Sequence, residues 1–439
     1  MRGLAARNGG RLGLAALAAI LLLGLGLRTA EAWDGRSPVY DAQGYATIAA
    51  SLERGEGFDL GAGATQPASN YSAGVPLLAG GLYAVTGGVH ERLARLALAL
   101  IGTLAVLFAY LIGRRLSGPL AGLVGAGVVA IYPALLEYQG MLMGEPIAAT
   151  LLSGAVLAML WAASTGEEGR GSPRPSFFRW MLPGVLLGAL ALVRPEYIAI
   201  ALPIAVVILA RRGWDGWRAS LGQAVILLVG LAVVVAPWTV RNAVVLDRFV
   251  PVSTGGGQVL FAGSYMPSDG DPERVGAEVL ERHPELRQEL PQDPRLEQIL
   301  AALAAQRYPG VESDAALARM GRERLWDDVS EQPVEYAGFV AAKVWRVWSH
   351  GPRDVMREPI WTVFHLLLVG VGLLGLVVLV RQRRWEALLI GVVLLSVTAT
   401  GALLVASPRR VLVTIPLVAA LAGVGATACR DSLARRWQG

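Results

Sequence analysis

The sequence predicts an all-α polytopic membrane protein with about ten transmembrane helices and a small, mostly helical subdomain outside the bilayer. Three observations carry this prediction. The chain of 439 residues is 54% hydrophobic and only 17% charged, whereas a typical soluble domain has about 25% charged residues. Its mean hydropathy is +0.49, and long stretches contain no charged residue at all. Arginines cluster at the ends of these apolar stretches, as they do in membrane proteins.

Composition and charge also exclude several other classes of protein. A disordered chain needs low hydrophobicity and high charge, and the single cysteine, Cys429, allows no internal disulfide. The pI of about 9.5 is compatible with nucleic-acid binding, but the arginines flank apolar runs and form no basic stripe. Of 39 basic residues only Lys343 is a lysine. This bias is typical of a bacterial genome of high GC content.

Apolar runs long enough for a membrane helix, about 20 residues, occur along most of the chain. We expect ten spans, at residues 11–29, 92–112, 119–136, 146–164, 180–193, 196–210, 220–238, 360–380, 386–405 and 410–428. The first is followed by Ala30-Glu31-Ala32, which is similar to a signal-peptide cleavage site, and this alternative leaves nine spans. Residues 75–87 are apolar but short, which favours an interfacial helix.

Arginine clusters beside the spans predict the orientation of the chain. Arg2, Arg7 and Arg11 precede the first span, so the positive-inside tendency places the N-terminus in the cytoplasm. Four later clusters fall on the same side, at 114–115, 211–212, 381–384 and 430–436. We therefore expect a multi-pass protein of the cell (plasma or inner) membrane. Its parts are an N-terminal transmembrane module at 1–240 with a first outer loop at 30–90, an extracytoplasmic subdomain at 241–358, and C-terminal transmembrane helices at 359–439.

The predicted subdomain at 241–358 is the only segment outside the spans that is long enough to fold as a subdomain. Within it, 277–305 and 315–331 have helical patterns interrupted by prolines. From Val334 to Trp348, apolar residues recur at helical spacing with Lys343 alongside. This pattern predicts an amphipathic helix on the outer membrane surface.

Ionisable residues are almost absent from the interiors of the predicted spans, and His365 is the nearest exception. Many pumps and ion-driven transporters carry such residues at membrane depth, so their scarcity counts against transport. The polar residues gather instead at the predicted outer ends of the spans: Asp34, Asp41, Glu137, Glu145, Arg194, Glu196, Arg241, Arg409 and Arg410. We therefore expect the functional site at the extracytoplasmic membrane face.

Six short motifs occur in order along nearly the whole chain. They are Asp41-Ala-Gln-Gly-Tyr45, Met143-Gly-Glu145-Pro146, Leu192-Val-Arg194-Pro195-Glu196, Pro237-Trp238-Thr-Val-Arg241-Asn242, Phe249-Val-Pro251-Val-Ser-Thr254-Gly-Gly-Gly257 and Ser407-Pro408-Arg409-Arg410. As an ordered set on this topology, they resemble the GT-C superfamily of polyprenyl-phosphate-sugar-dependent glycosyltransferases. Within it they are most similar to the protein mannosyltransferase-like and lipid A aminoarabinose transferase-like enzymes.

The resemblance implies a GT-C-type fold and a transferase that moves a sugar from a polyprenyl-phosphate donor to an extracytoplasmic glycan, lipid or protein. The leaving group of such a reaction is a phosphate anion, which needs cations and no general acid. The acceptor hydroxyl or amine benefits from one carboxylate base. Displacement with that base on the far face of the sugar inverts the anomeric configuration. Membrane lipid is the expected surrounding, and no nucleic acid is expected as a partner.

The resemblance and the chemistry of the residues together assign roles. Asp41 is the expected catalytic base, with Glu145 beside it. The expected phosphate-binding cations are Arg241, Arg194, Arg410, Arg409 and Lys343, and the expected substrate pocket contains Tyr45, Glu137, Tyr138 and Glu196. No cofactor follows from the motifs, and a divalent metal ion stays open.

Plainer structural roles exist for the same residues. Asp41 is a favourable N-cap for a helix at 42–54, and Glu145 complements the dipole of the helix that it opens. Arg194 and Arg241 also fit arginines that extend to the membrane interface. Lys343 fits an exposed lysine on the amphipathic helix.

Two alternatives concern larger features. Asp269-Gly-Asp271 is similar to a metal-binding DxD pair, but an acidic turn between prolines explains it more simply. For the whole protein, the rival functions are a transporter or flippase of lipid-linked sugars and a non-catalytic assembly partner with a GT-C-like fold.

Overall fold

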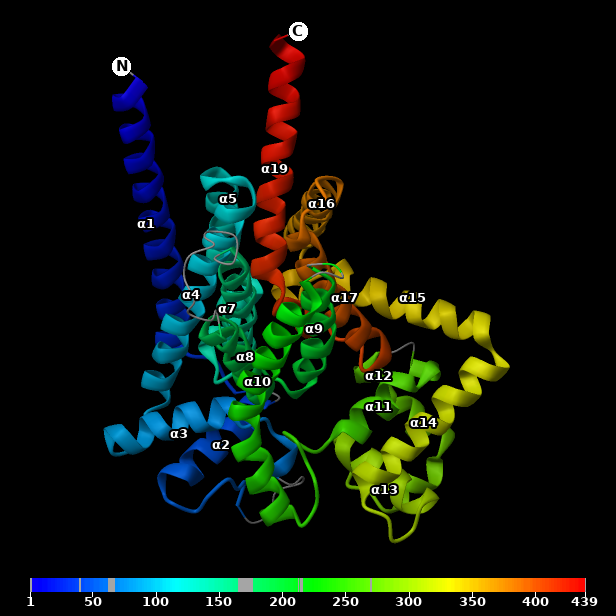
Figure 1. Cartoon of the computed structure of the whole chain (residues 1–439). Helices are drawn as coiled ribbons and strands as arrows, with labels where there is room; N and C mark the ends of the chain where they lie inside the picture. Colours follow the sequence, from blue (N-terminus) through cyan, green and yellow to red (C-terminus); the bar gives the residue numbers. More distant parts are fainter. Residues whose placement is uncertain are drawn as a thin grey trace.

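The computed structural model of the chain consists of helices and connecting loops (Figure 1). It describes residues 2–38, 41–61, 68–164, 177–211, 213, 216–268 and 271–438. Among these residues there is no β-strand, and seven helices are long and apolar enough to cross a membrane. They are α1 (Arg2–Asp34), α4 (Glu91–Ser117), α7 (Glu145–Ser164), α10 (Trp217–Leu246), α16 (Pro359–Arg381), α17 (Trp385–Leu403) and α19 (Ile415–Gln438). The predicted all-α, multi-pass fold is confirmed.

The three other predicted spans are also helical, but they are bent or short. The helix α5 (Pro119–Ile131) continues after a 53° bend into α6 (Pro133–Glu137) and the 3₁₀-helix η2 (Tyr138–Gly140). The apolar helices α8 (Phe177–Val193) and α9 (Ala201–Ala210) are short, and the 3₁₀-helix η3 (Pro195–Ile200) joins them at Arg194. Pro133 and Pro195 stand at these two breaks, because proline has no N–H for the helical hydrogen bond.

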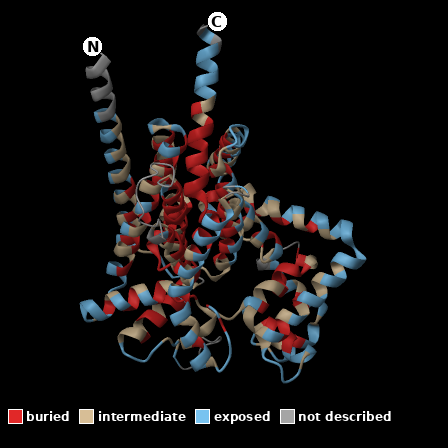
Figure 2. Cartoon of the chain, viewed as in Figure 1, coloured by how far each residue is buried: buried red, intermediate tan, exposed pale blue. Residues whose placement is uncertain are grey.

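The helices pack closely around α7, whose most apolar window is 78% buried. Glycines allow the tightest contacts. A Cβ atom on Gly184 of α8 would lie 2.0 Å from the carbonyl oxygen of Leu227 on α10, so only glycine fits there. Figure 2 shows buried residues concentrated in the central helices, whereas α1 is exposed along most of its length. This distribution suits a bundle whose outer helices face lipid.

The first outer loop folds as two helices, α2 (Asp41–Glu53) and α3 (Gly74–Thr86), which pack against each other. The 3₁₀-helix η1 (Ala68–Asn70) precedes α3, and α3 coincides with the predicted interfacial segment 75–87. Gly44 lies so close to Tyr71 that a Cβ atom would be 2.2 Å from the ring. These contacts fix the start of α2 and therefore the position of Asp41.

The segment between α10 and α16 forms a separate helical unit, at the lower right in Figure 1. Its elements are α11 (Gly256–Ser264), η5 (Met266–Ser268), α12 (Pro272–Arg282), η6 (Pro284–Gln288), α13 (Leu296–Arg307), α14 (Ser313–Glu331), α15 (Pro333–Ser349) and η7 (Asp354–Arg357). Phe261, Val279, Leu300 and Leu317 belong to its own apolar core. The amphipathic α15 returns from this unit to the bundle, where it packs against α16 and α17.

Both chain ends lie at the same end of the bundle in Figure 1, and α2, α3 and the helical unit lie at the other end. This arrangement agrees with the predicted alternation of spans. We keep as a prediction that the chain ends are cytoplasmic and that the helical unit is extracytoplasmic.

Cysteine labelling tests this orientation. The native Cys429 is exposed near the C-terminal end, and Gln292 is exposed in the helical unit. In intact cells we expect a membrane-impermeant maleimide to label Gln292→Cys in a Cys429→Ser background, and to label native Cys429 only after permeabilisation. The reverse pattern would contradict the predicted orientation.

Candidate active site

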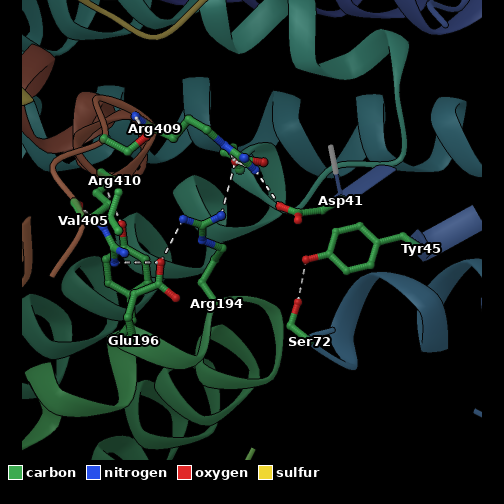
Figure 3. Close-up of polar contacts among 11 residues, drawn as sticks. Asp41, Tyr45, Ser72, Arg194, Glu196, Val405, Arg409 and Arg410 are labelled. Carbon is green, nitrogen blue, oxygen red and sulfur yellow. Dashed lines mark hydrogen bonds and ion pairs between the residues drawn. The ribbon is translucent and has the colours of Figure 1, made fainter. Parts of the chain in front are cut away.

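Six charged residues from four parts of the chain form one continuous ion-paired network at the end of the bundle opposite the chain ends (Figure 3). In order of contact they are Asp41, Arg409, Glu145, Arg194, Glu196 and Arg410. Carboxylates and guanidiniums alternate along it, so the charges balance. The sequence analysis had proposed every one of these residues for the site, and the structure brings them together.

Arg409 joins the two acids that the sequence predicts for catalysis. Its Nη2 atom lies 2.9 Å from Asp41 Oδ2, and its Nε and Nη2 atoms lie 2.7 and 2.6 Å from Glu145 Oε1. Burial by itself would lower the pKa of Arg409, but the carboxylates of Glu145 and Asp41 raise this pKa well above its ordinary value. Arg409 therefore stays charged and holds both acids.

Glu145 is the most deeply buried member of the network. Its side chain is 0% exposed, and Oε1 accepts hydrogen bonds from both Arg409 and Arg194. Its second oxygen, Oε2, is buried and accepts no hydrogen bond from any residue that the structure describes. A helix-dipole role for Glu145 remains compatible with its place at the first residue of α7. Two arginine partners, however, show that it also holds charged groups of other helices.

The inner half of the network connects η3 with the start of the last span. Arg194 Nη2 lies 2.8 Å from Glu196 Oε1, and the Nη1 atom of Arg410 lies 3.4 Å from the same oxygen. Arg410 belongs to the short helix α18 (Arg409–Leu412). Its carbonyl oxygen accepts a 2.6 Å hydrogen bond from the Tyr197 hydroxyl, and its Nε donates to the Val405 carbonyl. Arg194 is therefore a buried network member and not an exposed interfacial arginine.

Asp41 is the exposed member of the network. Its side chain is 42% exposed, and its Oδ1 atom accepts no hydrogen bond from the described residues. The carboxylate also accepts no hydrogen bond from a backbone N–H of the described residues. The N-cap role is therefore wrong, although Asp41 is the first residue of α2. One turn further on, the buried Tyr45 shares a 2.8 Å hydrogen bond with Ser72. Asp41 thus has one oxygen held by Arg409 and one free.

Lys343 is fully buried, so the prediction of an exposed lysine is wrong. Its Nζ atom donates a 2.6 Å hydrogen bond to the Gly263 carbonyl of α11 and lies 5.0 Å from the centre of the Phe339 ring. Burial, and secondarily the positive charge of Arg410, lowers the pKa of Lys343 to about 7. Lys343 and Arg410 therefore form a pair of neighbouring cations beside the network.

Arg241 does not join the other predicted cations. Its guanidinium lies over the rings of Phe58 and Trp238, 5.5 and 4.9 Å from their centres, and donates to Asn242. The predicted convergence of Arg241 with Arg194 and Arg410 is therefore absent from the contacts of the described residues.

Glu137 and Tyr138 lie beside the network with two arginines that the sequence analysis missed. Glu137 Oε1 accepts hydrogen bonds of 2.9 and 2.7 Å from Arg353 and one of 3.4 Å from Arg36. The Tyr138 ring centre is 5.9 Å from the guanidinium carbons of both Arg353 and Arg409. A sequence signal for Arg353 exists, because Pro-Arg precedes α16 just as Pro-Arg precedes the last span.

The described residues contain no group of three or more His, Cys, Asp or Glu side chains that could hold a metal ion. Asp269, from the motif that is similar to a DxD pair, lies outside the described residues. The carboxylates of Asp41 and Glu145 both pair with Arg409.

One family model matches the chain, that of the dolichyl-phosphate-mannose-protein mannosyltransferases (PMT_2). The match covers residues 73–240, which is less than half of the chain. This stretch includes Glu145, Arg194 and Glu196. No curated protein matches the chain in sequence.

A solved oligosaccharyltransferase shares the fold. The oligosaccharyltransferase AglB from Archaeoglobus fulgidus, in complex with an inhibitory peptide and a dolichol-phosphate, has a TM-score of 0.60 and 15% identity over 97% of this chain and 51% of its own. The apo form of the A. fulgidus oligosaccharyltransferase gives a TM-score of 0.60 and 14% identity, over 97% and 52%. ArnT from Cupriavidus metallidurans bound to undecaprenyl phosphate has 15% identity over 94% and 78%, with a TM-score of 0.37. The chain spans about half the length of the oligosaccharyltransferase whose fold it shares.

Removing the charge of Glu145 should destabilise the protein strongly. In Glu145→Gln, two buried arginines lose their shared carboxylate, and breaking such a pair costs about 3–5 kcal/mol. We expect a clear fall in the midpoint of thermal unfolding in detergent. Glu386→Gln is the matched control, because Glu386 is also a buried acid at the start of a helix but has the single, more exposed partner Arg384. Equal losses in both variants would show that Glu145 is no more than a helix-terminal acid.

Proposed function

We propose that this chain, whose fold is that of the GT-C superfamily, is a membrane glycosyltransferase that moves a sugar from a polyprenyl-phosphate donor to an extracytoplasmic acceptor. The single observation that carries the proposal is the junction of Asp41, Arg409 and Glu145 at one end of the bundle. It supplies a half-exposed carboxylate, fixed by a cation, next to further buried cations. Transfer of a sugar from a lipid phosphate needs both a carboxylate base for the acceptor and cations for the phosphate.

The donor half of the reaction needs positive charge. As the bond between the sugar and the phosphate breaks, negative charge develops on the phosphate oxygens, and preorganised cations stabilise it. Arg410 and Lys343 suit this task, because they are close enough for the charge of Arg410 to act on Lys343. Glu196, the partner of Arg410, is also shared with Arg194. We assign the donor phosphate to these two cations. Arg241 stays a proposed contact for the donor outside the network.

The acceptor half needs a base. Asp41 Oδ1 is free to accept the proton of an acceptor hydroxyl or amine, while Arg409 fixes the orientation of the carboxylate through Oδ2. The leaving phosphate takes no proton, so one base suffices. Attack from the side of Asp41, opposite the phosphate, inverts the configuration at the anomeric carbon.

The similar proteins support, in general terms, a donor that carries a lipid phosphate. AglB, which shares the fold, has been solved with a dolichol-phosphate, and the matching family model describes enzymes named for dolichyl-phosphate-mannose. For this chain we propose only that the sugar donor carries a lipid phosphate. The acceptor is a glycan, lipid or protein on the same side of the membrane.

Replacing Asp41 by asparagine tests the proposed base. General base catalysis contributes about 10²–10⁴-fold, so we expect kcat of Asp41→Asn to fall by about that factor with donor and acceptor saturating. Donor binding should persist, because asparagine has nearly the same shape and Lys343 and Arg410 remain. Turnover is measured with a polyprenyl-phosphate sugar and membrane extract as the source of acceptor.

Asp34→Asn is the control for this experiment, because Asp34 is an exposed acid seven positions earlier. We expect it to keep wild-type turnover. If Asp41→Asn also turned over at the wild-type rate, Asp41 would not be the base, and Glu145, with its free buried oxygen, would be the next candidate.

The pKa of Lys343 predicts how donor binding depends on pH. The phosphodiester of the donor stays singly ionised, so only the protein titrates. Below about pH 7 the amine is already charged, and affinity should be constant. Above about pH 7 the amine must take up a proton to bind the phosphate, and affinity should fall by up to about tenfold per pH unit.

Titration calorimetry with a donor analogue at several pH values measures this effect. Lys343→Arg keeps the charge at all these pH values and should remove the pH dependence. A pH dependence that persists in Lys343→Arg would exclude Lys343 as its source.

A further inference from the structure

We propose that Arg28, a buried cation in the first membrane span, is a positioning residue that caps the break between α5 and α6. Through this break it fixes the loop that carries Glu137 and Tyr138 beside the candidate active site. The effect on turnover rests on the proposed function, whereas the effect on stability is independent of it.

Arg28 lies in an unusual environment for a charged side chain. It is 1% exposed and belongs to α1, a candidate span. It falls at the predicted outer end of the first span, 11–29, where an arginine can extend to the membrane interface. Instead its Nη2 donates a 2.8 Å hydrogen bond to the Val129 carbonyl, and its Nη1 donates to the carbonyls of Ala130 at 3.2 Å and Gly24 at 3.1 Å. No ion pair joins it to a carboxylate in the described part of the chain.

The acceptors of Arg28 are free because of Pro133. In a continuous helix, the carbonyl of Val129 would accept the N–H of residue 133, but proline has none. The 53° bend lies at this point, and the Ala130 carbonyl next to Val129 also accepts from Arg28. A bare carbonyl inside a membrane bundle costs several kcal/mol, and the planar guanidinium can serve two adjacent carbonyls at once.

The helical segment after the break forms one wall of the candidate site. Glu137 and Tyr138 lie four and five residues after Pro133, and the Tyr138 ring lies beside Arg409. The residues just after α1 hold this segment a second time, because the backbone N–H of Arg36 donates to the Gly140 carbonyl at 2.8 Å. The outer part of α1 and the residues that follow it therefore hold both the beginning and the end of the loop.

The surroundings of Gln139 also support the positioning role of Arg28. Gln139 is 0% exposed, and the Nε of Arg28 and both amide atoms of Gln139 lack hydrogen-bond partners among the described residues. A Cβ atom on Gly102 of α4 would lie 2.3 Å from Gln139 Nε2 and 3.6 Å from Arg28 Nε. Both polar groups therefore approach the same glycine, which places Arg28 beside the loop that carries Glu137 and Tyr138.

A double-mutant cycle between Arg28 and Pro133 tests the proposal. Arg28→Met removes the cap and keeps the length of the side chain, and Pro133→Ala restores an N–H for the Val129 carbonyl. We expect Arg28→Met to lower the midpoint of thermal unfolding in detergent by about 5 °C in the wild-type background. It should lower this midpoint clearly less in the Pro133→Ala background. Equal shifts in both backgrounds would overturn the proposal.

Arg95→Met is the matched control. Arg95 is also a mostly buried arginine that donates to a backbone carbonyl of α1, that of Ala32, but it lies away from the break. Its replacement should give the same shift with and without Pro133. If Arg28→Met does not accumulate in membranes, Arg28→Gln takes its place in the cycle, because glutamine can still donate to one carbonyl.

The kinetic measurement separates a positioning role from a purely structural one. In Arg28→Met protein that is folded at the assay temperature, kcat should fall by about 10–100-fold because the wall of the site shifts. Donor affinity should stay unchanged, and Arg28→Lys should restore part of kcat. Unchanged kcat would overturn the positioning role, whereas a complete lack of transferase activity in the wild type would contradict the proposed function and leave the stability cycle valid.

Discussion

The arrangement of this end of the bundle depends on one buried carboxylate, that of Glu145. A charge with no exposed surface is costly unless opposite charges and hydrogen bonds compensate it. Arg409 from the start of the last span and Arg194 from the end of α8 both supply this compensation. Each arginine then needs a second acid, which Asp41 and Glu196 provide. The burial of one side chain thus determines how four distant parts of the sequence must meet.

Helix breaks supply the polar groups of this network. A continuous membrane helix satisfies its own backbone and leaves little room for charged groups, whereas a break exposes carbonyls and N–H groups that need partners. The break at Pro195 places Arg194 and Glu196 on one turn, and the turn before α19 places Arg409 and Arg410. The break at Pro133 brings Glu137 and Tyr138 beside them. Proline positions along the chain therefore mark where the site forms.

Part of this organisation could be predicted from the sequence, because it depends on local patterns. Apolar runs gave all ten helical segments, and clustered polar residues at their outer ends gave the six members of the network. Pairing could not be predicted, because Asp41 and Arg409 are 368 residues apart and no periodicity connects them. The burial of Lys343 was misjudged for the same reason. Lys343 lies on an amphipathic helix where its own sequence pattern looks exposed, and only the packing of other elements encloses it.

The charge balance of the site follows from these burial relations and bears on the proposed reaction. The six-residue network is neutral, and the pKa of the neighbouring Lys343, lowered to about 7, makes the charge of this amine depend on pH near neutrality. A donor phosphodiester brings one negative charge and completes the balance without breaking the pairs that hold Asp41. After transfer, the free lipid phosphate gains a second ionisation with a pKa of about 6, so the product carries more negative charge than the donor. Because added negative charge nearby favours the protonated amine, we expect Lys343 to stay charged while this product is bound, and the product to be released more easily at a pH above the pKa of Lys343.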